Sequence, residues 1–291
     1  MSSSDVVGRS RFKGLAESAA KLGSAGRSTL DYVRVRRTFA HLHSYCIFMG
    51  SGRSGSTLLG AMLNAHPEIV ISNELDALYL FSLGVPRNII FSQILKQERQ
   101  FATSGYQWTG YDYAVPGQYQ GRVERLLVIG DKKAGQSTRR LENNPGLLDD
   151  VRHSIRVPIR VIHIVRNPFD NITTMYRRQP HRFDGAGGLR ATIDFYRQLT
   201  ATVDDVRARL QPDEFFDVRY ESFVDSPGPH LVRLCAFLGV GAPADYIEAC
   251  AKIVRSASRT RDQVTWSDAE RHEVEALIES HPHLADYGYD T

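Results

Sequence analysis

Residues 45–74, YCIFMGSGRSGSTLLGAMLNAHPEIVISNE, decide the fold of this chain. They begin with a short apolar run at 45–49, whose length suits a buried strand. A loop rich in Gly and Ser follows at 50–57, and apolar residues then recur at helical spacing over 58–63. A second apolar run at 69–71 indicates another strand. A strand, a glycine-rich loop and a helix in this order present backbone N–H groups and a helix N-terminus to a phosphate.

The loop departs from the P-loop of nucleoside triphosphatases at one position. The P-loop pattern is G-x-x-x-x-G-K-[ST], and Gly50, Gly55 and Thr57 supply its two glycines and its hydroxyl. Ser56 stands where that pattern has lysine, and the basic residue Arg53 lies inside the loop instead. Because an NTPase uses the lysine to hold the β- and γ-phosphates, the loop favours some other phosphate-bearing nucleotide. The loop alone leaves open a tight Gly/Ser turn with no ligand.

Length and charge limit the architecture and the partners. A chain of 291 residues with 42% hydrophobic residues suits one large α/β domain, which we assign to residues 44–291. Residues 1–43 are predicted to be a basic, flexible or peripheral segment, since residues 1–40 hold eight Arg or Lys against three Asp or Glu. Solvation, peripheral membrane contact and partner docking are the roles left open for it. The net charge is only +3 and the arginine clusters are local, so we expect anionic small molecules and no nucleic acid.

Cysteine usage and hydropathy exclude several classes of protein. The three cysteines, Cys46, Cys235 and Cys250, lie in apolar or helical surroundings, and no C-x-x-C or Cys/His ligand spacing occurs. The sequence therefore predicts neither a disulfide framework nor a metal site. It has no apolar span of 18 residues and no secretory leader pattern, so we expect a cytoplasmic protein without a membrane span.

Two further strands end in basic residues. The apolar run 126–129 leads into Gly-Asp-Lys-Lys, so Lys132 lies at a strand end. The apolar run 157–165 leads into Arg166, after which Asn-Pro indicates a helix start. Ligand groups gather at the carboxyl ends of parallel strands. Thr174 and Arg178 follow Arg166 on one face of the predicted helix, so the three side chains can form a second phosphate site or a surface salt-bridge cluster.

The remainder of the chain continues the alternation of strands and helices. Residues 189–210 are typical of an amphipathic helix, and residues 215–220 of a strand that ends at Tyr220. A turn at 226–229 is expected to precede a helix that ends at Gly239. The basic loop 255–261 can close over an anion. This alternation predicts a central, mostly parallel sheet flanked by helices, while the irregular aromatic segment 75–120 is predicted either to cover the site or simply to pack on the core.

Together these motifs resemble the PAPS-dependent sulfotransferases, which move a sulfuryl group from 3′-phosphoadenosine 5′-phosphosulfate (PAPS) to an acceptor. Three stretches carry the resemblance: IFMGSGRSGSTLLGAMLNAHPEI resembles the 5′-phosphosulfate loop, VIHIVRNPFDNITTMYRR the 3′-phosphate segment, and DVRYESFVDSPGPHLVRLCAFLGV a later strand–turn–helix. The spacing between Arg53 and Glu74 is most similar to the branch that contains tyrosylprotein and many bacterial sulfotransferases. The resemblance spans residues 44 to about 290 and implies a P-loop-NTPase-like, three-layer α/β fold.

The resemblance also implies roles for individual residues. Glu74 matches the proposed general base, and Arg53 and Lys132 match residues that assist at the sulfuryl group. The 5′-phosphosulfate would be bound by the loop residues Ser51, Gly52, Arg53, Ser54, Gly55, Ser56 and Thr57. The 3′-phosphate would be bound by Arg166, Thr174 and Arg178, with threonine where serine is usual. Tyr220, Arg259 and Arg261 correspond more loosely to donor-binding residues.

The predicted reaction is an in-line transfer (class EC 2.8.2) to an acceptor hydroxyl or amine, without a metal and with adenosine 3′,5′-bisphosphate (PAP) as product. Asp76 and His66 are rival bases: Asp76 would share a strand face with Glu74 if the strand continued, whereas His66 beside Pro67 suits a turn-stabilising role. A carbohydrate, a lipid or a small metabolite is the expected acceptor. The alternatives are a kinase with an unusual P-loop, a non-catalytic nucleotide-binding protein of the same fold and, with the least support, a nucleic-acid binder. The sequence does not predict an oligomeric state.

Overall fold

The computed structural model describes residues 38–178 and 188–291. The predicted N-terminal segment, residues 1–43, lies outside the described residues over its first 37 positions. Residues 41–291 form one compact unit. No helix in the described part of the chain has the length and apolar character needed to cross a bilayer.

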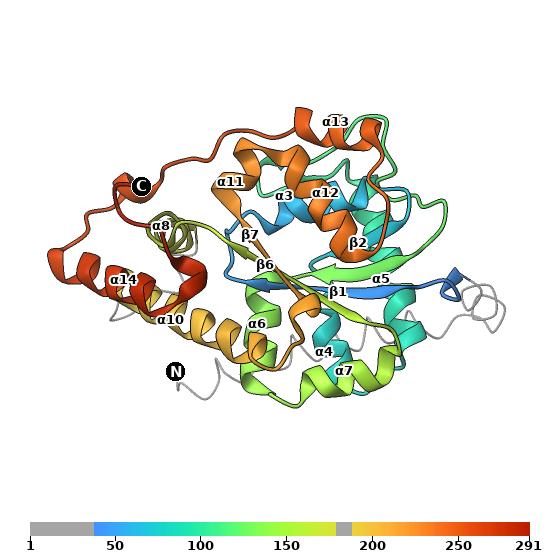
Figure 1. Ribbon diagram of the computed structural model, residues 1–291, viewed down its shortest axis with the longest axis horizontal. Helices are drawn as coiled ribbons and strands as arrows, with labels where there is room; N and C mark the ends of the chain where they lie inside the picture. Colours follow the sequence, from blue (N-terminus) through green and yellow to red (C-terminus); the bar gives the residue numbers. More distant parts are fainter. Residues whose placement is uncertain (1–37, 179–187) are drawn as a thin grey trace, which may run out of the picture. The chain divides into compact units, whose positions relative to one another are not determined.

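A parallel sheet of five strands lies at the centre of this unit (Figure 1). Its strand order is β2-β5-β1-β6-β7, and each neighbouring pair is parallel. The strands are β1 (Ser44–Gly50), β2 (Ile69–Asn73), β5 (Val128–Lys132), β6 (Ile159–Val165) and β7 (Phe215–Arg219). The chain runs from β1 to one side of the sheet and later to the other, so the carboxyl end of β1 lies at the topological switch point where such sheets bind ligands.

Helices cover both faces of the sheet, which is why its strands are almost continuously apolar. One face packs against α3 (Ser56–Asn64), α11 (Tyr220–Asp225), α12 (Pro227–Leu238) and α13 (Ala244–Lys252). The other packs against α4 (Ala77–Ser82), α5 (Arg87–Thr103), α6 (Ala134–Asn143), α7 (Leu147–Ile155) and α10 (Gly188–Arg207). Alternate residues of β1 serve the two layers: Cys46 and Phe48 pack toward α3 and α12, whereas the ring of Tyr45 stacks on Phe91 of α5. The predicted three-layer α/β class is therefore confirmed.

The carboxyl-terminal part of the chain builds a smaller apolar cluster beside the sheet. Helix α8 (Pro168–Arg178) and α10 pack there against α14 (Asp268–Ser280). Of the short 3-10 turns, η2 (Pro212–Glu214) lies between α10 and β7, whereas η3 (Arg261–Gln263) precedes α14 and η4 (Pro282–Leu284) follows it. Phe169 lies at the centre of the cluster, with the rings of Trp266 and Tyr289 edge-on to it at 5.0 and 5.1 Å. The cluster fixes α8 beside the end of β1, where the predicted 3′-phosphate residues are needed.

Two sequence predictions about local structure are wrong. The segment 75–120 is more regular than expected, because α4 and the 17-residue α5 occupy most of its first half and a short hairpin, β3 (Gln107–Trp108) with β4 (Tyr111–Asp112), follows. The turn expected at 226–229 is the first turn of α12, which begins at Pro227. Proline fits there because the first N–H groups of a helix have no intrahelical acceptor. Gly239 does end this helix in the left-handed conformation, as predicted.

Candidate active site

The Gly/Ser loop connects β1 to α3 through a backbone that turns left-handed at Gly50, Arg53 and Gly55 (φ 118°, 66° and 96°). Two features exclude a side chain at Gly55. The backbone there is left-handed, and a Cβ would lie 2.3 Å from Cδ2 of Tyr220. Helix α3 begins at the next residue, Ser56. The loop therefore wraps around the N-terminus of α3, and the free N–H groups of that first turn favour an anion.

Buried side chains from other elements hold the loop in this shape. Asn171 of α8, which has no exposed surface, accepts a hydrogen bond from Ser51 Oγ (2.8 Å) and donates Nδ2–H to the Gly52 carbonyl (2.7 Å). The hydroxyl of Thr138 on α6 accepts from Gly50 N–H at 2.9 Å. Ser54 Oγ, also buried, donates to the Ser51 carbonyl at 3.0 Å. The loop is thus rigid before any ligand binds, which lowers the entropic cost of binding.

One side of the loop faces the ends of β2 and β5, and we call it the open side. Three side chains meet there: Glu74, Lys132 and Thr57. Lys132 Nζ lies 2.5 Å from Glu74 Oε1 and 3.1 Å from Thr57 Oγ1. The lysine comes from the end of β5, the glutamate follows the end of β2, and the threonine is in the first turn of α3. The three predicted residues, which are far apart in the sequence, are therefore one hydrogen-bonded group at the carboxyl edge of the sheet.

Burial strengthens the interaction of the Lys132 ammonium with nearby negative charge. Its side chain is 2% exposed, whereas that of Glu74 is 32% exposed. Desolvation lowers the pKa of Lys132, and the nearby Glu74 carboxylate partly opposes this shift. An ammonium group held in so dry a place interacts strongly with any further negative charge brought to the loop. The glutamate, in contrast, can be reached from solvent.

The two rival bases are committed to other contacts. Strand β2 ends at Asn73, so Asp76 does not continue the strand face of Glu74. Its carboxylate binds the Arg140 guanidinium at 2.9 and 3.3 Å. His66 is buried: its Nδ1 accepts from Glu68 N–H (3.1 Å), which leaves Nε2–H to donate to the Gly241 carbonyl (2.9 Å). Of these three groups, Glu74 is therefore the one that lies beside the loop and reaches solvent.

The predicted 3′-phosphate residues lie on the other side of the loop. Arg166, at the end of β6, donates to the Arg53 carbonyl (3.4 Å), to Thr174 Oγ1 (3.5 Å) and to the Ser258 carbonyl (2.6 Å). Its Nε is buried and has no acceptor among the described residues. Arg178 is exposed in the last turn of α8, one turn beyond Thr174. The structure thus brings Arg166 and Thr174 together and places Arg178 farther along the same helix.

The ring of Tyr220 completes this side of the loop. Its centroid lies 5.5 Å from Cζ of Arg166, and its edge lies against Gly55. Burial raises the pKa of Tyr220, so the hydroxyl remains protonated at neutral pH. Tyr220 therefore lies as a neutral ring between the loop and the predicted 3′-phosphate residues.

The basic loop 255–261 reaches the site mainly through its small residues. Arg261 is buried, and its guanidinium pairs with Asp170 Oδ2 at 2.7 Å and donates to the carbonyls of Gly288 and Tyr289. Burial alone would raise the pKa of Asp170, but the hydrogen bonds and charge of Arg261 outweigh it and lower that pKa. Arg259 pairs with Asp262 at 3.0 Å. Both arginines thus fasten the loop to its surroundings, and donor binding by them stays a prediction.

Tyr111 and Tyr113 of the hairpin region lie near Tyr220. Trp108 and Tyr111 are 39% and 48% exposed. Burial raises the pKa of Tyr113 to about 12, while the charge of nearby Arg53 opposes the shift. Most of 75–103 is helical, and coverage of the site by the aromatic segment stays a prediction.

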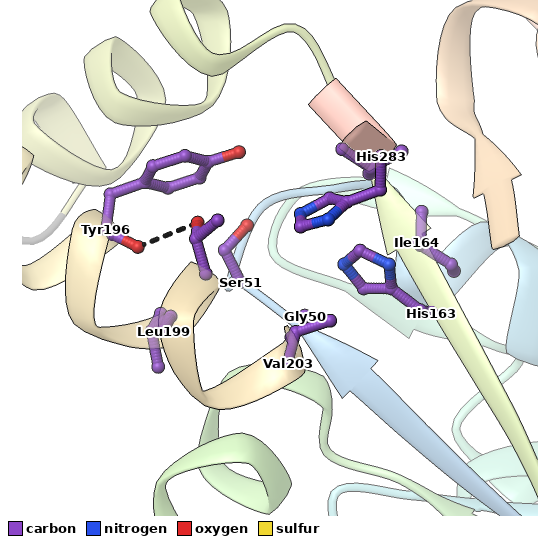
Figure 2. A pocket seen from close by; sticks show the side chains of 10 residues that line it. Gly50, Ser51, His163, Ile164, Tyr196, Leu199, Val203 and His283 are labelled. Atoms are coloured by element: carbon purple, nitrogen blue, oxygen red, sulfur yellow. Dashed lines mark hydrogen bonds between the residues drawn. The ribbon is translucent and has the colours of Figure 1, made fainter. Parts of the chain in front are cut away.

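A small cavity lies behind the loop, on the α10 side (Figure 2). Gly50 and Ser51 line it together with His163 and His283, whose ring centroids are 5.0 Å apart. Burial lowers the pKa of His283 to about 4, so this ring is neutral at pH 7. Asp217 accepts from His163 and from an arginine of α10, and these bonds outweigh the effect of burial and lower its pKa to about 2. Neither Glu74 nor Lys132 lines this cavity, so it is separate from the open side of the loop.

Sequence reasoning missed three residues that shape the site. Asn171 lies three residues before Thr174, on the helix face already assigned to phosphate binding, so helical spacing could have identified it. Asp131 immediately precedes Lys132 and is buried at the same strand end. Thr138 lies in a helix with no local signal, and only the packing of α6 on β1 brings it to Gly50.

The donor set matches the chemistry of a nucleotide with two separate anionic groups. Backbone N–H groups and Lys132 face one side of the loop, and Arg166 with its unpaired Nε faces the other. Within the described residues, no group of three or more His, Cys, Asp or Glu side chains is arranged to hold a metal ion. The residues present fit a phosphosulfate at one end and a 3′-phosphate at the other.

Comparison with known proteins agrees with this geometry. Residues 158–244 match the model of the sulfotransferase family. A relative from Mycobacterium bovis, the omega-hydroxy-beta-dihydromenaquinone-9 sulfotransferase Stf3, is 26% identical over 166 residues, which are 50% of this chain and 41% of the relative. The same protein from Mycobacterium tuberculosis matches equally. The chain thus aligns with less than half the length of these curated relatives.

Solved structures show the same fold. The sulfotransferase domain of the Synechococcus PCC 7002 olefin synthase has a TM-score of 0.51 and 18% identity, covering 82% of this chain and 94% of that domain. The sulfotransferase domain of the curacin biosynthetic pathway has a TM-score of 0.50 and 17% identity, covering 83% and 98%. The resemblance to sulfotransferases drawn from the sequence motifs is confirmed.

Proposed function

We propose that this chain, given its confirmed resemblance to the sulfotransferases, transfers a sulfuryl group from PAPS to an acceptor hydroxyl. The observation that carries the proposal is the group formed by Glu74, Lys132 and Thr57 at the phosphate-type loop. It combines a solvent-accessible carboxylate with a buried ammonium at the point where an anion would bind.

The loop and Lys132 supply the electrostatic part of the mechanism. The phosphosulfate is bound by backbone N–H groups of residues 51–57 and by the side chain of Arg53. As the bond between sulfur and the bridging phosphate oxygen breaks, its electron pair remains on that oxygen, and the Lys132 ammonium stabilises the charge. Burial of Lys132 strengthens this effect because little water screens the interaction.

Glu74 supplies the acid–base part. The acceptor oxygen attacks sulfur in line with the leaving oxygen, and the hydroxyl proton passes to the Glu74 carboxylate. In the free protein this carboxylate is paired with Lys132 at 2.5 Å. Once the ammonium turns toward the bound phosphosulfate, the carboxylate is released from its ion pair and can accept a hydrogen bond from the acceptor hydroxyl. Donor binding thereby activates the group that deprotonates the acceptor.

The second anion region would bind the 3′-phosphate. Arg166 offers its unpaired Nε, Thr174 offers a hydroxyl, and Arg178 can reach in from the exposed end of α8. A kinase would instead require the P-loop lysine, which Ser56 replaces. The metal-independent donor PAPS therefore fits these residues better than ATP with magnesium.

The acceptor class is inferred from a named relative and from an exposed aromatic ring. The Mycobacterium relative is named for an omega-hydroxylated dihydromenaquinone, and here the ring of Tyr111 is 48% exposed and lies near Tyr220. We place an apolar alcohol first among the acceptors, before carbohydrates and other small metabolites. The assigned domain 44–291 and a cytoplasmic location stay predictions.

Titration calorimetry with PAP, without added metal, tests the donor. Wild type should bind PAP, and Arg166→Ala should bind it at least tenfold more weakly, since a guanidinium–phosphate interaction is lost. Arg190→Ala, which changes an exposed arginine of α10 paired with Glu273, is the matched control and should bind as wild type does. Binding of ATP with magnesium in place of PAP would overturn the proposal in favour of a kinase.

Transfer of labelled sulfate from PAPS to a panel of alcohols tests the reaction. Glu74→Gln should lower kcat by a factor of about 10² or more, as expected for loss of a general base, with PAP affinity little changed. Near-normal turnover in Glu74→Gln would remove the base assignment. PAP binding without turnover on any acceptor would favour the non-catalytic alternative.

A further inference from the structure

We infer that Asp131 is a positioning residue, which holds the turn that carries Glu74 and thereby aims the proposed base at Lys132 and the loop. This inference rests on the function proposed above. Asp131 is 5% exposed at the end of β5, one residue before Lys132, and does not itself face the loop. Its carboxylate is directed at the neighbouring strand end, where β2 leaves the sheet.

The carboxylate of Asp131 accepts three hydrogen bonds from the segment that contains Glu74. Its Oδ1 accepts from Ser72 Oγ at 2.7 Å and from Leu75 N–H at 3.1 Å. Its Oδ2 accepts from Ala77 N–H at 2.8 Å. Both oxygens thus act only as acceptors, as an ionised carboxylate does. The bonds span residues 72 to 77, with Glu74 in the middle.

The held segment has a backbone that ordinary residues avoid. Glu74 and Asp76 both adopt the left-handed conformation, with φ of 64° and 70°. Two such residues within three positions are costly for side chains other than glycine and persist only where the surroundings impose them. The Asp131 bonds fall on Leu75 and Ala77, the residues that follow each left-handed one. The carboxylate therefore stabilises this turn directly.

Other contacts complete the attachment of the turn. Glu74 N–H donates to the Lys132 carbonyl at 3.0 Å, and Lys133 Nζ donates to the Glu74 carbonyl at 3.3 Å. Arg140 binds the Asp76 side chain. Asp131 differs from these partners because its one carboxylate binds the turn at two backbone positions at once. Its position also couples the turn to the strand that carries Lys132, so base and ammonium are placed by adjacent residues of β5.

The chemistry requires aspartate rather than asparagine at this position. An amide has one acceptor oxygen, and its NH₂ group would face either Ala77 N–H or the pair formed by Leu75 N–H and the Ser72 hydroxyl. Two donors would then oppose each other in a buried place. Asp131→Asn should therefore release one side of the turn while keeping the size of the side chain.

Kinetics and binding measured on the full chain distinguish positioning from a general structural role. Asp131→Asn should lower kcat for sulfuryl transfer at least tenfold, while the Kd for PAP stays within about twofold of wild type. In the Glu74→Gln background the same substitution should have almost no further effect on the residual rate, because it acts through Glu74. Glu98→Gln, an isosteric change at a carboxylate buried in α5, is the matched control and should keep kcat.

Two further measurements keep the inference testable if Asp131→Asn folds poorly or transfer is not observed. Ser72→Ala removes one donor to Asp131 and should lower kcat by a smaller factor in the same direction. Amide hydrogen exchange at Leu75 and Ala77 should accelerate at least tenfold in Asp131→Asn, with exchange in β1 and β6 unchanged.

The outcomes separate this inference from the proposed function. Wild-type kcat and unchanged exchange at Leu75 and Ala77 in Asp131→Asn would overturn the positioning role. A fall in kcat of equal size in the wild-type and Glu74→Gln backgrounds would do so as well. If wild type neither binds PAP nor transfers sulfate, the proposed function fails, and the exchange measurement still decides whether Asp131 holds the turn.

Discussion

Replacing Asn171 by alanine should disable the phosphate-type loop without touching a ligand-contacting group. Asn171 is fully buried and makes two hydrogen bonds to the loop, from Ser51 Oγ at 2.8 Å and to the Gly52 carbonyl at 2.7 Å. It lies on α8, the helix that also carries Thr174. The side chain therefore ties the predicted 3′-phosphate helix to the predicted 5′-phosphosulfate loop.

The size of the effect follows from these two bonds. Each buried hydrogen bond contributes about 1 kcal/mol net, and a buried group left unpaired costs about 1–3 kcal/mol. Ser51 can turn its hydroxyl to another acceptor, but the Gly52 carbonyl cannot move without its chain. The expected total is about 2–4 kcal/mol against the ordered loop. If binding must restore that order, the Kd for PAP rises by a factor of about 30 to 900.

Titration calorimetry with PAP measures this factor, and circular dichroism checks that the fold is kept. Asn171→Asp is the informative partner variant, since it retains an acceptor for Ser51 but places a carboxylate oxygen against the Gly52 carbonyl. It should bind PAP more weakly than Asn171→Ala, because it adds negative charge beside an anion site. Asn143→Ala, at the exposed end of α6, should bind as wild type does. A Kd within twofold of wild type in a folded Asn171→Ala protein would refute the reasoning.

Two other substitutions test the loop and the region behind it. Gly55→Ala should weaken PAP binding at least tenfold, since the new Cβ would lie 2.3 Å from the Tyr220 ring at a φ of 96°. The control is Gly239→Ala, at a glycine that is also left-handed (φ 80°) but has open space around it. This control should lose only about 1 kcal/mol of stability and bind PAP as wild type does. Equal PAP affinities in the two variants would contradict this account. Asp217→Asn should be less stable than wild type at pH 7, because the bond from His163 helps to lower the pKa of Asp217 to about 2. The stability that this bond adds is present above the unfolded pKa of about 3.9 and is lost as pH falls toward 2. Denaturant titrations should therefore show the difference in unfolding free energy between wild type and Asp217→Asn narrowing from pH 4 to pH 2. A difference that stays constant over this range would argue against the role of the Asp217 carboxylate.

The sequence by itself determined the class of fold and most of the residues that meet at the site. Apolar runs of strand length, the glycine-rich loop after the first of them and basic residues at two later strand ends are local signals. Parallel strands place their carboxyl ends at one edge, so these signals converge without any knowledge of packing. That is why Lys132, Arg166 and Thr174 could be named in advance, while the resemblance to sulfotransferases supplied the role of Glu74 and the roles of Arg53 and Lys132 at the sulfuryl group.

Other features depended on the tertiary structure, because their signals are not local. The sequence left Asp76 as a rival base to Glu74, and the end of β2 at Asn73 together with a salt bridge from α6 commits Asp76 to another contact. Arg261 has the composition of an anion binder, yet its charge is balanced by Asp170, which lies 91 residues earlier. Asp131 and Thr138 act through backbone groups of distant segments, and no sequence pattern encodes such a partner. The sequence named the residues that can carry the chemistry, and packing between distant segments decided which of them are free and how they are held.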